Sequence, residues 1–147
     1  KGFDLSAIFA YSIGGYIYNR DITMILHNGS LEGRDWSTEI LKRWTPDNRY
    51  TDVPALSTTS NDWNSASTRF LQNNSYMRLK NLTLSYNLPK QWISKLSLSS
   101  VQVYVQGDNL FTIHRNQGLD PEQGITGITY YRYPAMRTIS GGINVSF

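Results

Sequence analysis

The sequence predicts an all-β structure in which antiparallel strands of a transmembrane β-barrel are joined by long loops that contain short helices. Four segments alternate apolar and polar residues with a period of two, which is typical of strands with two unlike faces. The first and third segments run well past the length of about 5–6 residues that is usual for globular strands. The connections between the segments are very unequal in length, which is the pattern of outer-membrane barrels.

The first expected strand covers residues 3–18, where the stretch "FDLSAIFAYSIGGYI" places mostly apolar residues at odd positions. The second covers residues 75–88, where "NLTLSYNLP" places leucines and a tyrosine at even positions. Upstream of that stretch, Met77 and Leu79 are out of phase with the leucines. Because a one-residue slip exchanges the two faces of a strand, we expect a β-bulge near Lys80.

The third expected strand covers residues 100–113 and contains "VQVYVQGDNLFTI", with valines at odd positions. The fourth covers residues 136–147 and ends with "RTISGGINVSF". Chain ends usually fray and carry polar residues. Here the apolar row of Ile143, Val145 and Phe147 continues to the last residue, so we expect these residues to belong to a strand.

Three connections join the expected strands. Residues 19–74 form a very long one, residues 114–135 a shorter one, and residues 89–99 a short link that opens with Pro89, which cannot donate to a β-ladder. If the first strand runs outward through a membrane, the two long connections are extracellular loops and the short one is a periplasmic turn. The last strand then brings the C-terminus to the periplasmic side.

The loop of residues 19–74 is expected to contain short helices. Asp21 is a candidate N-cap for "ITMILHN". Asp35 is a candidate N-cap for "WSTEILKRW", which Pro46 would end. In that second segment, side chains at i, i+4 spacing share one face of the expected helix, and they are Trp36, Ile40 and Trp44.

Alternation alone leaves two folds open: a soluble β-sandwich, such as a carbohydrate-binding module, and a membrane barrel with one face in lipid. The polar rows favour the barrel, because they hold Ser, Asn, Gln, Thr and Gly and only two charged residues, Asp4 and Asp108. The apolar rows hold no charge, and a midplane Arg or Lys on a lipid face costs about 2–4 kcal/mol. Aromatic residues are expected near both strand ends, such as Phe147 at one and Phe111 at the other, as in the aromatic girdles of barrels.

The overall composition excludes several classes of function. The net charge is only +3 and the basic residues are scattered, so we expect no nucleic-acid partner. The chain has no cysteine, which excludes disulfides and thiolate metal sites. No apolar stretch approaches the roughly 20 residues of a membrane-spanning helix. The chain opens without an initiator methionine or a signal peptide, so we expect it to be a piece of a longer protein.

Several stretches resemble, in order and spacing, the C-terminal part of the SusC/RagA branch of TonB-dependent outer-membrane transporters. They are "SYMRLKNLTLSYNLPKQWISKL", "VQVYVQGDNLFTI", "LDPE" and "RTISGGINVSF". The upstream "LKRWTPDN" and "TDVPAL" and the opening "FDLSAIFAYSIGGYIYN" resemble the same family, so the resemblance covers nearly the whole chain.

The resemblance implies that the four strands are the last four of a plugged barrel of about 22 strands. It implies import of glycans or peptides across the outer membrane of a Bacteroidetes-type bacterium. The implied partners are outer-membrane lipid, a SusD-type surface lipoprotein that acts as a lid, and the TonB complex, reached through an N-terminal region absent from this chain. A terminal aromatic strand is read by the barrel-assembly machinery, and Ile143, Val145 and Phe147 match that signal.

The loops carry aromatic candidates for contact with the substrate or the lid, but no recognisable set of acid, base and nucleophile, so we expect no enzyme activity. Neither His27 nor His114 has a serine or carboxylate at a telling spacing. Aromatic rings can stack on a sugar, and packing inside the loops is the alternative role. The candidates are Trp36, Trp44, Trp63, Tyr130 and Tyr131.

One pair of carboxylates is a candidate cation site. Asp120 and Glu122, in "LDPEQG", could bind a cation together with loop carbonyl groups. The alternative is a turn set by Pro121 and Gly124. We expect no cofactor.

Overall fold

The computed structural model describes residues 2–29, 31, 33–59, 65–116, 118, 120–122 and 126–147. The chain forms two compact units, which are described separately. The strand unit comprises Lys1–Gly14, Asn74–Asn116 and Pro134–Phe147, and the loop unit comprises Gly15–Asn73 and Gln117–Tyr133. Within the described ranges, no helix has both the length and the apolar character needed to cross a membrane.

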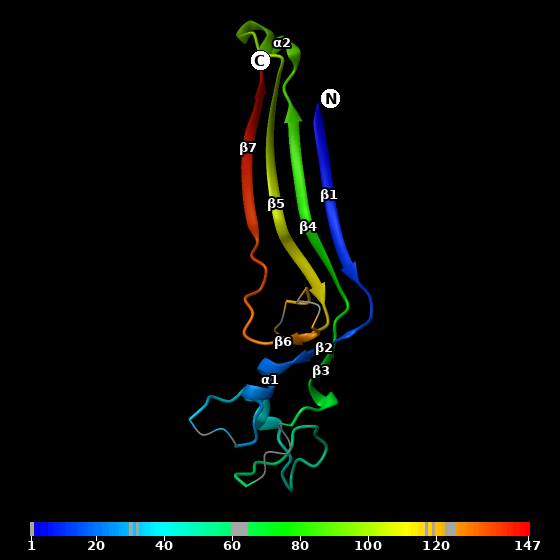
Figure 1. Ribbon diagram of the computed structural model, residues 1–147, viewed down its shortest axis with the longest axis vertical. Helices are drawn as coiled ribbons and strands as arrows, with labels where there is room; N and C mark the ends of the chain where they lie inside the picture. The colour runs from blue at the N-terminus through cyan, green and yellow to red at the C-terminus, as the bar shows by residue number, and fades with distance from the viewer. Residues whose placement is uncertain are drawn as a thin grey trace. The chain divides into compact units, whose positions relative to one another are not determined.

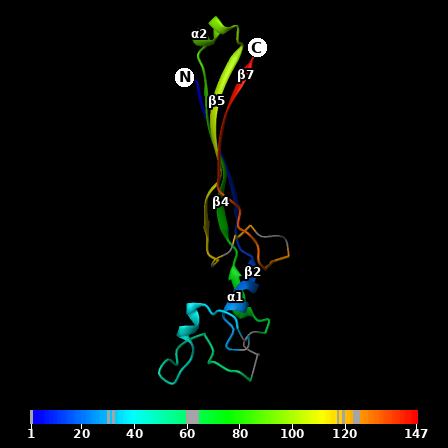
Figure 2. The same ribbon diagram turned by 90° about the vertical axis from the view of Figure 1, so that its left-hand side faces the viewer.

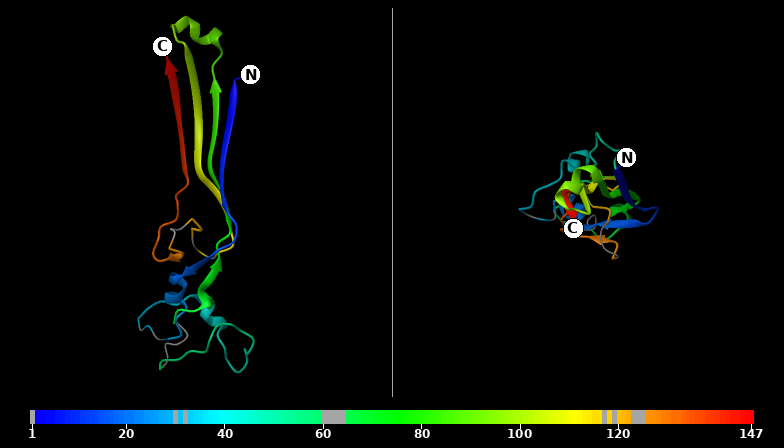
Figure 3. Two further views of the ribbon diagram at one scale, coloured as in Figure 1. Left: turned by 45° about the vertical axis from the view of Figure 1, so that its right-hand side comes forward. Right: turned by 90° about the horizontal axis from the view of Figure 1, so that it is seen from above.

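The strand unit contains one four-stranded antiparallel sheet with the order β1-β4-β5-β7 (Figure 1). Its strands are β1 (Phe3–Ser12), β4 (Tyr76–Asn87), β5 (Ser100–His114) and β7 (Thr138–Ser146). The sheet is a single layer when it is seen near its edge in Figure 2, and the strands lie side by side again in the left panel of Figure 3. The predicted all-β fold with four antiparallel strands is confirmed.

The connection from β4 to β5 folds into two short helical turns, α2 (Lys90–Ile93) and η4 (Ser94–Leu96). Pro89 precedes α2 as its N-cap residue, and the Ile93 side chain is buried. Both chain ends lie at the same end of the sheet as α2 (Figure 1). The short link was expected, whereas its helical form was not.

The predicted bulge near Lys80 is confirmed. In the pairing of β1 with β4, Ile8 lies opposite Asn81 and Phe9 lies opposite Leu79, so Lys80 has no residue opposite it. The extra residue shifts the phase of β4 by one position. As a result, Leu79 joins the same face as the leucines that follow the bulge.

The register separates an apolar face of the sheet from a polar one. Phe3 pairs with Tyr86 and Leu5 with Leu84, so their side chains lie on one face. On the strand unit as described, no second layer covers that face, and Leu5 is 72% exposed. The apolar face continues across β5 and β7 through Val101, Val103, Val105, Ile139, Ile143 and Val145. A sandwich core at this face, the alternative prediction, is therefore absent from the strand unit.

The loop unit is built around a small sheet with the order β3-β2-β6. Its elements are β2 (Tyr16–Asn19), α1 (Arg20–Ile25), η1 (Thr38–Lys42), η3 (Thr68–Phe70), β3 (Leu71–Asn73) and β6 (Ile128–Thr129). Strand β2 pairs antiparallel with β3 and parallel with β6. Among the described residues of this unit, four buried side chains form an apolar core, and they are Ile17, Ile40, Val53 and Phe70.

The expected first strand of residues 3–18 is wrong in its extent, because it is divided into two strands in different sheets. Strand β1 ends at Ser12, and β2 begins at Tyr16. Between them, Gly14 and Gly15 adopt φ values of +82° and +76°. This left-handed backbone favours glycine and interrupts a strand.

The expected caps and the second helix were also wrong. Helix α1 is capped by Asn19, whose side-chain oxygen accepts a hydrogen bond from the Ile22 amide at 3.1 Å, and Asp21 lies in the first turn instead. The second segment forms only the 3₁₀ turn η1, capped by Ser37 rather than Asp35.

Because η1 covers only Thr38–Lys42, it is too short to align the three side chains that were expected on one helix face. Trp36 and Trp44 lie outside the turn, at opposite ends of it, and only Ile40 lies within it, where its side chain is buried. The residue after the turn, Arg43, is extended with ψ of 157°, which ends the helical geometry before Trp44.

Candidate functional site

The apolar face of the strand unit carries bulky apolar side chains whose exposure to water is unfavourable. Ile143 is 64% exposed and lies opposite Val103, and Val145 lies opposite Val101. Burying one such side chain in an apolar environment is worth about 1.5–3 kcal/mol. The face is therefore a candidate surface for lipid, and it contains Ile143 and Val145, two of the three residues of the predicted assembly signal.

Phe147, the third residue of that signal, follows the last residue of β7 and is 91% exposed. Strand β7 is hydrogen-bonded to β5 along one edge, and its other edge has no partner in the strand unit as described. The outer edge of β1 also has no partner strand in the strand unit as described. An unpaired edge is a template for a further strand.

The polar face holds a network around one carboxylate. The Asn81 side-chain amide donates to Asp108 Oδ1 at 2.8 Å, and the Gln106 amide donates to both carboxylate oxygens at 3.2 Å. The Thr83 hydroxyl donates to the Asn81 side-chain oxygen at 2.9 Å. These groups satisfy one another, so the face is ordered although it carries little charge.

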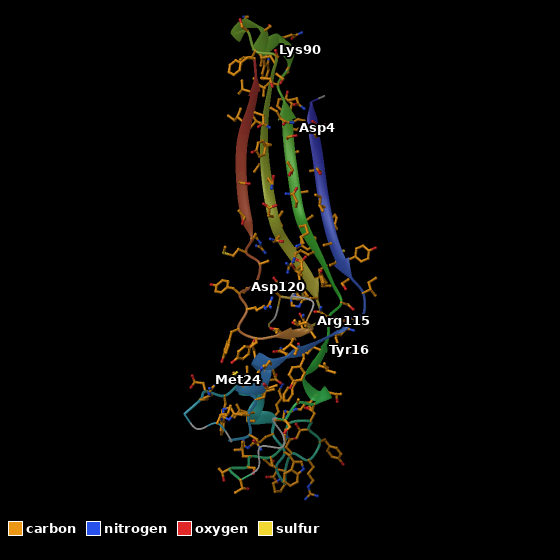
Figure 4. All side chains as sticks on the ribbon, viewed as in Figure 1. Asp4, Tyr16, Met24, Lys90, Arg115 and Asp120 are labelled. Atoms are coloured by element: carbon orange, nitrogen blue, oxygen red, sulfur yellow. The ribbon has the colours of Figure 1, made fainter. Side chains whose placement is uncertain are left out.

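A second set of amide bonds connects neighbouring strands across the polar face. The Asn144 amide donates to Gln102 Oε1 at 3.2 Å, and the Gln102 amide donates to the Ser85 hydroxyl at 3.3 Å. The Asn87 amide donates to Asp4 Oδ2 at 2.7 Å, which links β4 to β1; Asp4 is labelled in Figure 4. The amide-rich rows in the sequence indicated this face, but the pairing of the amides depends on the register.

Two of the loop aromatics that were expected to contact substrate or lid lie together in the loop unit. The ring centroids of Tyr130 and Tyr131 are 4.3 Å apart, and the Arg20 guanidinium lies 4.7 Å from the Tyr130 centroid. Asp21 Oδ1 accepts a hydrogen bond from the Tyr131 amide at 3.0 Å. Tyr131 has φ of +46°, an uncommon conformation for a bulky residue. The carboxylate of Asp21 therefore helps to hold this exposed tyrosine pair in place.

Trp36 is bound to a buried histidine. Its indole N–H donates to His27 Nδ1 at 3.1 Å, and the two ring centroids are 5.4 Å apart. His27 is fully buried. Burial lowers the pKa of His27, because the charged imidazole loses its hydration there. This arrangement agrees with a packing role for Trp36, although the indole remains partly exposed.

Of the other two tryptophan candidates, only Trp44 belongs to the part of the chain that the structure describes. Trp44 is 44% exposed, and its backbone N–H donates to the Val53 carbonyl oxygen at 2.8 Å. Trp63 lies outside the described residues.

The candidate cation site contains a local turn. The Glu122 amide donates to Asp120 Oδ1 at 3.0 Å, and Pro121 between them is buried. Asp120 is labelled in Figure 4, whereas Gly124 lies outside the described residues. In the described part of the chain, no three His, Cys, Asp or Glu residues are grouped so as to hold a metal ion.

The chain has clear relatives among known proteins, although no protein-family model matches it. The TonB-dependent receptor P3 of Formosa agariphila is 34% identical over 158 aligned positions, which cover 100% of this chain and 15% of the relative. The TonB-dependent receptor P26 of the same organism is 30% identical over 157 positions, which cover 100% of this chain and 16% of the relative. The chain thus spans only a small part of the length of these relatives.

The fold also matches solved structures. The structure of the RagAB peptide transporter aligns with a TM-score of 0.87 and 35% identity, covering 100% of this chain and 16% of the solved chain. The RagAB peptide importer in its "closed-closed" and "open-open" states aligns with a TM-score of 0.85 in each case, at the same identity and coverage.

Proposed function

This chain belongs to the TonB-dependent receptor family, in its SusC/RagA branch, and we propose that it forms the last four barrel strands of an outer-membrane importer. The observation that carries the proposal is the contrast between the two faces of one uncovered sheet. One face is apolar and exposed, and the other is a ladder of amides and hydroxyls. A barrel wall between lipid and a polar lumen requires this contrast.

In the proposed orientation, residues 19–74 and 114–135 are extracellular loops and residues 89–99 form a periplasmic turn. The unequal lengths of these connections support it, because outer-membrane barrels have short periplasmic turns and longer outer loops. The C-terminus then lies at the periplasmic side, at the same end of the sheet as the short turn with α2 (Figure 1). The unpaired edges of β1 and β7 would pair with other strands of the barrel.

The proposed cargo is a glycan or a peptide, and the proposed partners are a SusD-type lipoprotein lid and the TonB complex. The names of the solved neighbours, which are peptide transporters, support a peptide. The tyrosine pair of Tyr130 and Tyr131 is proposed to contact the substrate or the lid, because it is exposed and held in place. We further propose that Asp120 and Glu122, beside the turn that they form, bind a cation in this loop.

The experiment that tests the barrel assignment compares two adjacent positions of β5 in the full-length receptor. Val105 lies on the apolar face and Gln106 on the polar face. Val105→Cys and Gln106→Cys are each treated, in outer-membrane vesicles, with a charged water-soluble maleimide and with an apolar one. We expect the charged reagent to label Gln106→Cys and to spare Val105→Cys. Equal labelling of both positions by the charged reagent would contradict the proposal.

A further inference from the structure

The loop unit contains a depression that is distinct from the tyrosine pair. It has a volume of about 520 Å³, and the residues that matter for its chemistry are Trp44, Asp52, Val53, Pro54, Ala55 and Arg69. A volume of about 300–1,000 Å³ is usual for sites that bind small ligands. All of these residues belong to the loop unit.

The segment that carries Trp44 is fixed by hydrogen bonds within the loop. The Asn48 amide donates to the Lys42 carbonyl oxygen at 3.0 Å, and the Thr51 hydroxyl donates to the same oxygen at 2.6 Å. The backbone hydrogen bond from the Trp44 N–H to the Val53 carbonyl oxygen joins the two ends of the segment. The backbone that carries the indole is therefore held in position before any ligand arrives, which reduces the entropy lost on binding.

One wall of the depression is apolar. Val53 is buried, and Pro54 and Ala55 are half-buried beside it. Trp44 is partly exposed at the same depression. This combination offers a ligand an apolar surface with one large aromatic ring, which is the usual setting for an aliphatic or aromatic side chain.

The polar group of the depression is the guanidinium of Arg69. Its Nη1 atom is buried and has no hydrogen-bond partner among the residues that the structure describes. The guanidinium carbon lies 5.3 Å from the ring centroid of the buried Phe70. Asp52 lines the same depression and makes no ion pair with Arg69 in the described part of the chain. Arg69 lines the depression, and a guanidinium there can bind an anionic oxygen of a ligand through charge-assisted hydrogen bonds.

A sugar fits this site less well than a peptide. A sugar ring needs several polar partners for its hydroxyls, but the Thr51 hydroxyl is already engaged, donating to Lys42 and accepting from the Val53 amide at 3.2 Å. Asp52 and Ser67 supply further polar atoms, and the other lining groups form an apolar wall next to the Arg69 cation. That pair matches the last residue of a peptide, whose side chain is apolar and whose main chain ends in a carboxylate.

We propose that the depression binds the C-terminal residue of a peptide, with an apolar side chain on Trp44, Val53 and Pro54 and the carboxylate on Arg69. The proposal rests on the proposed import function, since it gives the cargo a contact in an outer loop. In this proposal, the hydrogen-bonded loop that carries Trp44 presents the apolar wall to the peptide.

The test uses the full-length receptor purified in detergent and a fluorescent pentapeptide that ends in leucine with a free carboxylate. Binding is measured by fluorescence anisotropy. We expect Arg69→Gln to weaken binding about tenfold, because a charge-assisted hydrogen bond is lost. The same peptide with a C-terminal amide should bind the unmodified receptor about as weakly, and it should not be affected by Arg69→Gln.

The matched control is Arg49→Gln. Arg49 is exposed, its Nε donates to the Pro46 carbonyl oxygen at 2.9 Å, and it does not line the depression. This variant should bind the free peptide as the unmodified receptor does. Equal losses in both arginine variants, or no binding of the free peptide by the unmodified receptor at millimolar concentration, would overturn the proposal.

A second pair of variants tests the apolar wall. Trp44→Ala should weaken binding of the leucine peptide more than binding of a glycine-ended peptide, whereas Trp36→Ala, which changes an indole of equal 44% exposure, should have no such selectivity. Binding of maltopentaose that is lost in Trp44→Ala, without an effect on peptides, would assign the site to sugars and refute the proposal. Because binding is measured in detergent, a receptor that binds but does not import refutes only the proposed transport.

Discussion

The phenol group of Tyr104 lies directly over Gly142 on the neighbouring strand. The two residues are paired between β5 and β7, and a Cβ atom added at Gly142 would lie 2.7 Å from the tyrosine oxygen. The backbone of Gly142 does not require glycine, since its φ is outside the left-handed region. The glycine is therefore explained by a side-chain contact, in which the Tyr104 ring covers the backbone of β7 at Gly142.

The first prediction is that Gly142→Val destabilises the barrel of the full-length receptor. The added side chain meets the Tyr104 ring, and overpacking of this kind costs about 1–3 kcal/mol. The measurement is the urea midpoint of unfolding in detergent micelles. The combined variant Gly142→Val with Tyr104→Ala removes the ring and should recover most of the loss. If both variants unfold at the same midpoint, the contact does not explain the glycine.

The second prediction concerns charge on the two faces of β5. Val105→Lys places an ammonium group on the apolar face, which costs about 2–4 kcal/mol if it lies near the midplane of a bilayer. Gln106→Lys places the same group on the polar face, where water or other polar groups can solvate it. We expect a strong loss of heat-modifiable receptor in outer membranes for Val105→Lys only. Similar losses in the two variants would argue against a lipid-facing side.

The third prediction is a dependence of the loop unit on pH. Burial lowers the pKa of His27 in the folded loop, and the positive charge of nearby Arg34 also lowers it, while backbone groups of Arg34 and Asp35 oppose the shift. The unfolded segment takes up a proton near pH 6.5. The stability contributed by neutral His27 is therefore complete above about pH 6.5 and is lost as the pH falls toward the lower, folded-state pKa.

Protonation at Nδ1 also removes the acceptor for the Trp36 indole. Hydrogen exchange of the segment around residue 27, corrected for intrinsic rates, should thus be faster at pH 5 than at pH 7.5 in the full-length receptor. His27→Gln should flatten this difference. His114→Gln, which changes an exposed histidine of the strand unit, should leave it intact. Exchange that is independent of pH in the unmodified receptor would refute the prediction.

The faces and the bulge could be predicted from sequence because they depend on local alternation. The phase change between Leu79 and Leu82 already indicated an extra residue, and the structure places it at Lys80. The break after β1 was also signalled, by the paired Gly14 and Gly15, but the alternation on both sides of them suggested a single long strand.

Other features depend on contacts between distant residues, which alternation does not report. Tyr18 pairs in parallel with Ile128, more than a hundred positions along the chain. Asp21 was expected to cap a helix because of its residue type, but the neighbouring Asn19 has the same capability and takes that position. Asp21 instead binds the Tyr131 amide. The depression beside Trp44 likewise needs Arg69, whose proximity no spacing rule indicates.

The last prediction concerns the role of the exposed Phe147 ring in barrel assembly. Phe147 is 91% exposed and Tyr133 is 88% exposed, so truncation of either to alanine should change stability by only about 0.5 kcal/mol if both lie in water. Our assignment of Phe147 to the barrel-assembly signal predicts a different outcome. Phe147→Ala should lower the amount of full-length receptor that reaches the outer membrane, while its synthesis is unchanged. If the ring also lies against hydrocarbon, its loss removes about 1.5–3 kcal/mol of apolar burial.

Tyr133→Ala, which alters a loop residue of nearly equal exposure, should assemble normally. The measurement is the ratio of folded to unfolded receptor bands on gels of unheated membranes, with total receptor determined by immunoblot. A further variant, Phe147→Tyr, keeps a terminal aromatic ring and should restore assembly if the ring is what the machinery reads. Normal assembly of Phe147→Ala, or failure of Phe147→Tyr to restore a loss, would show that the terminal ring is not the feature that is recognised.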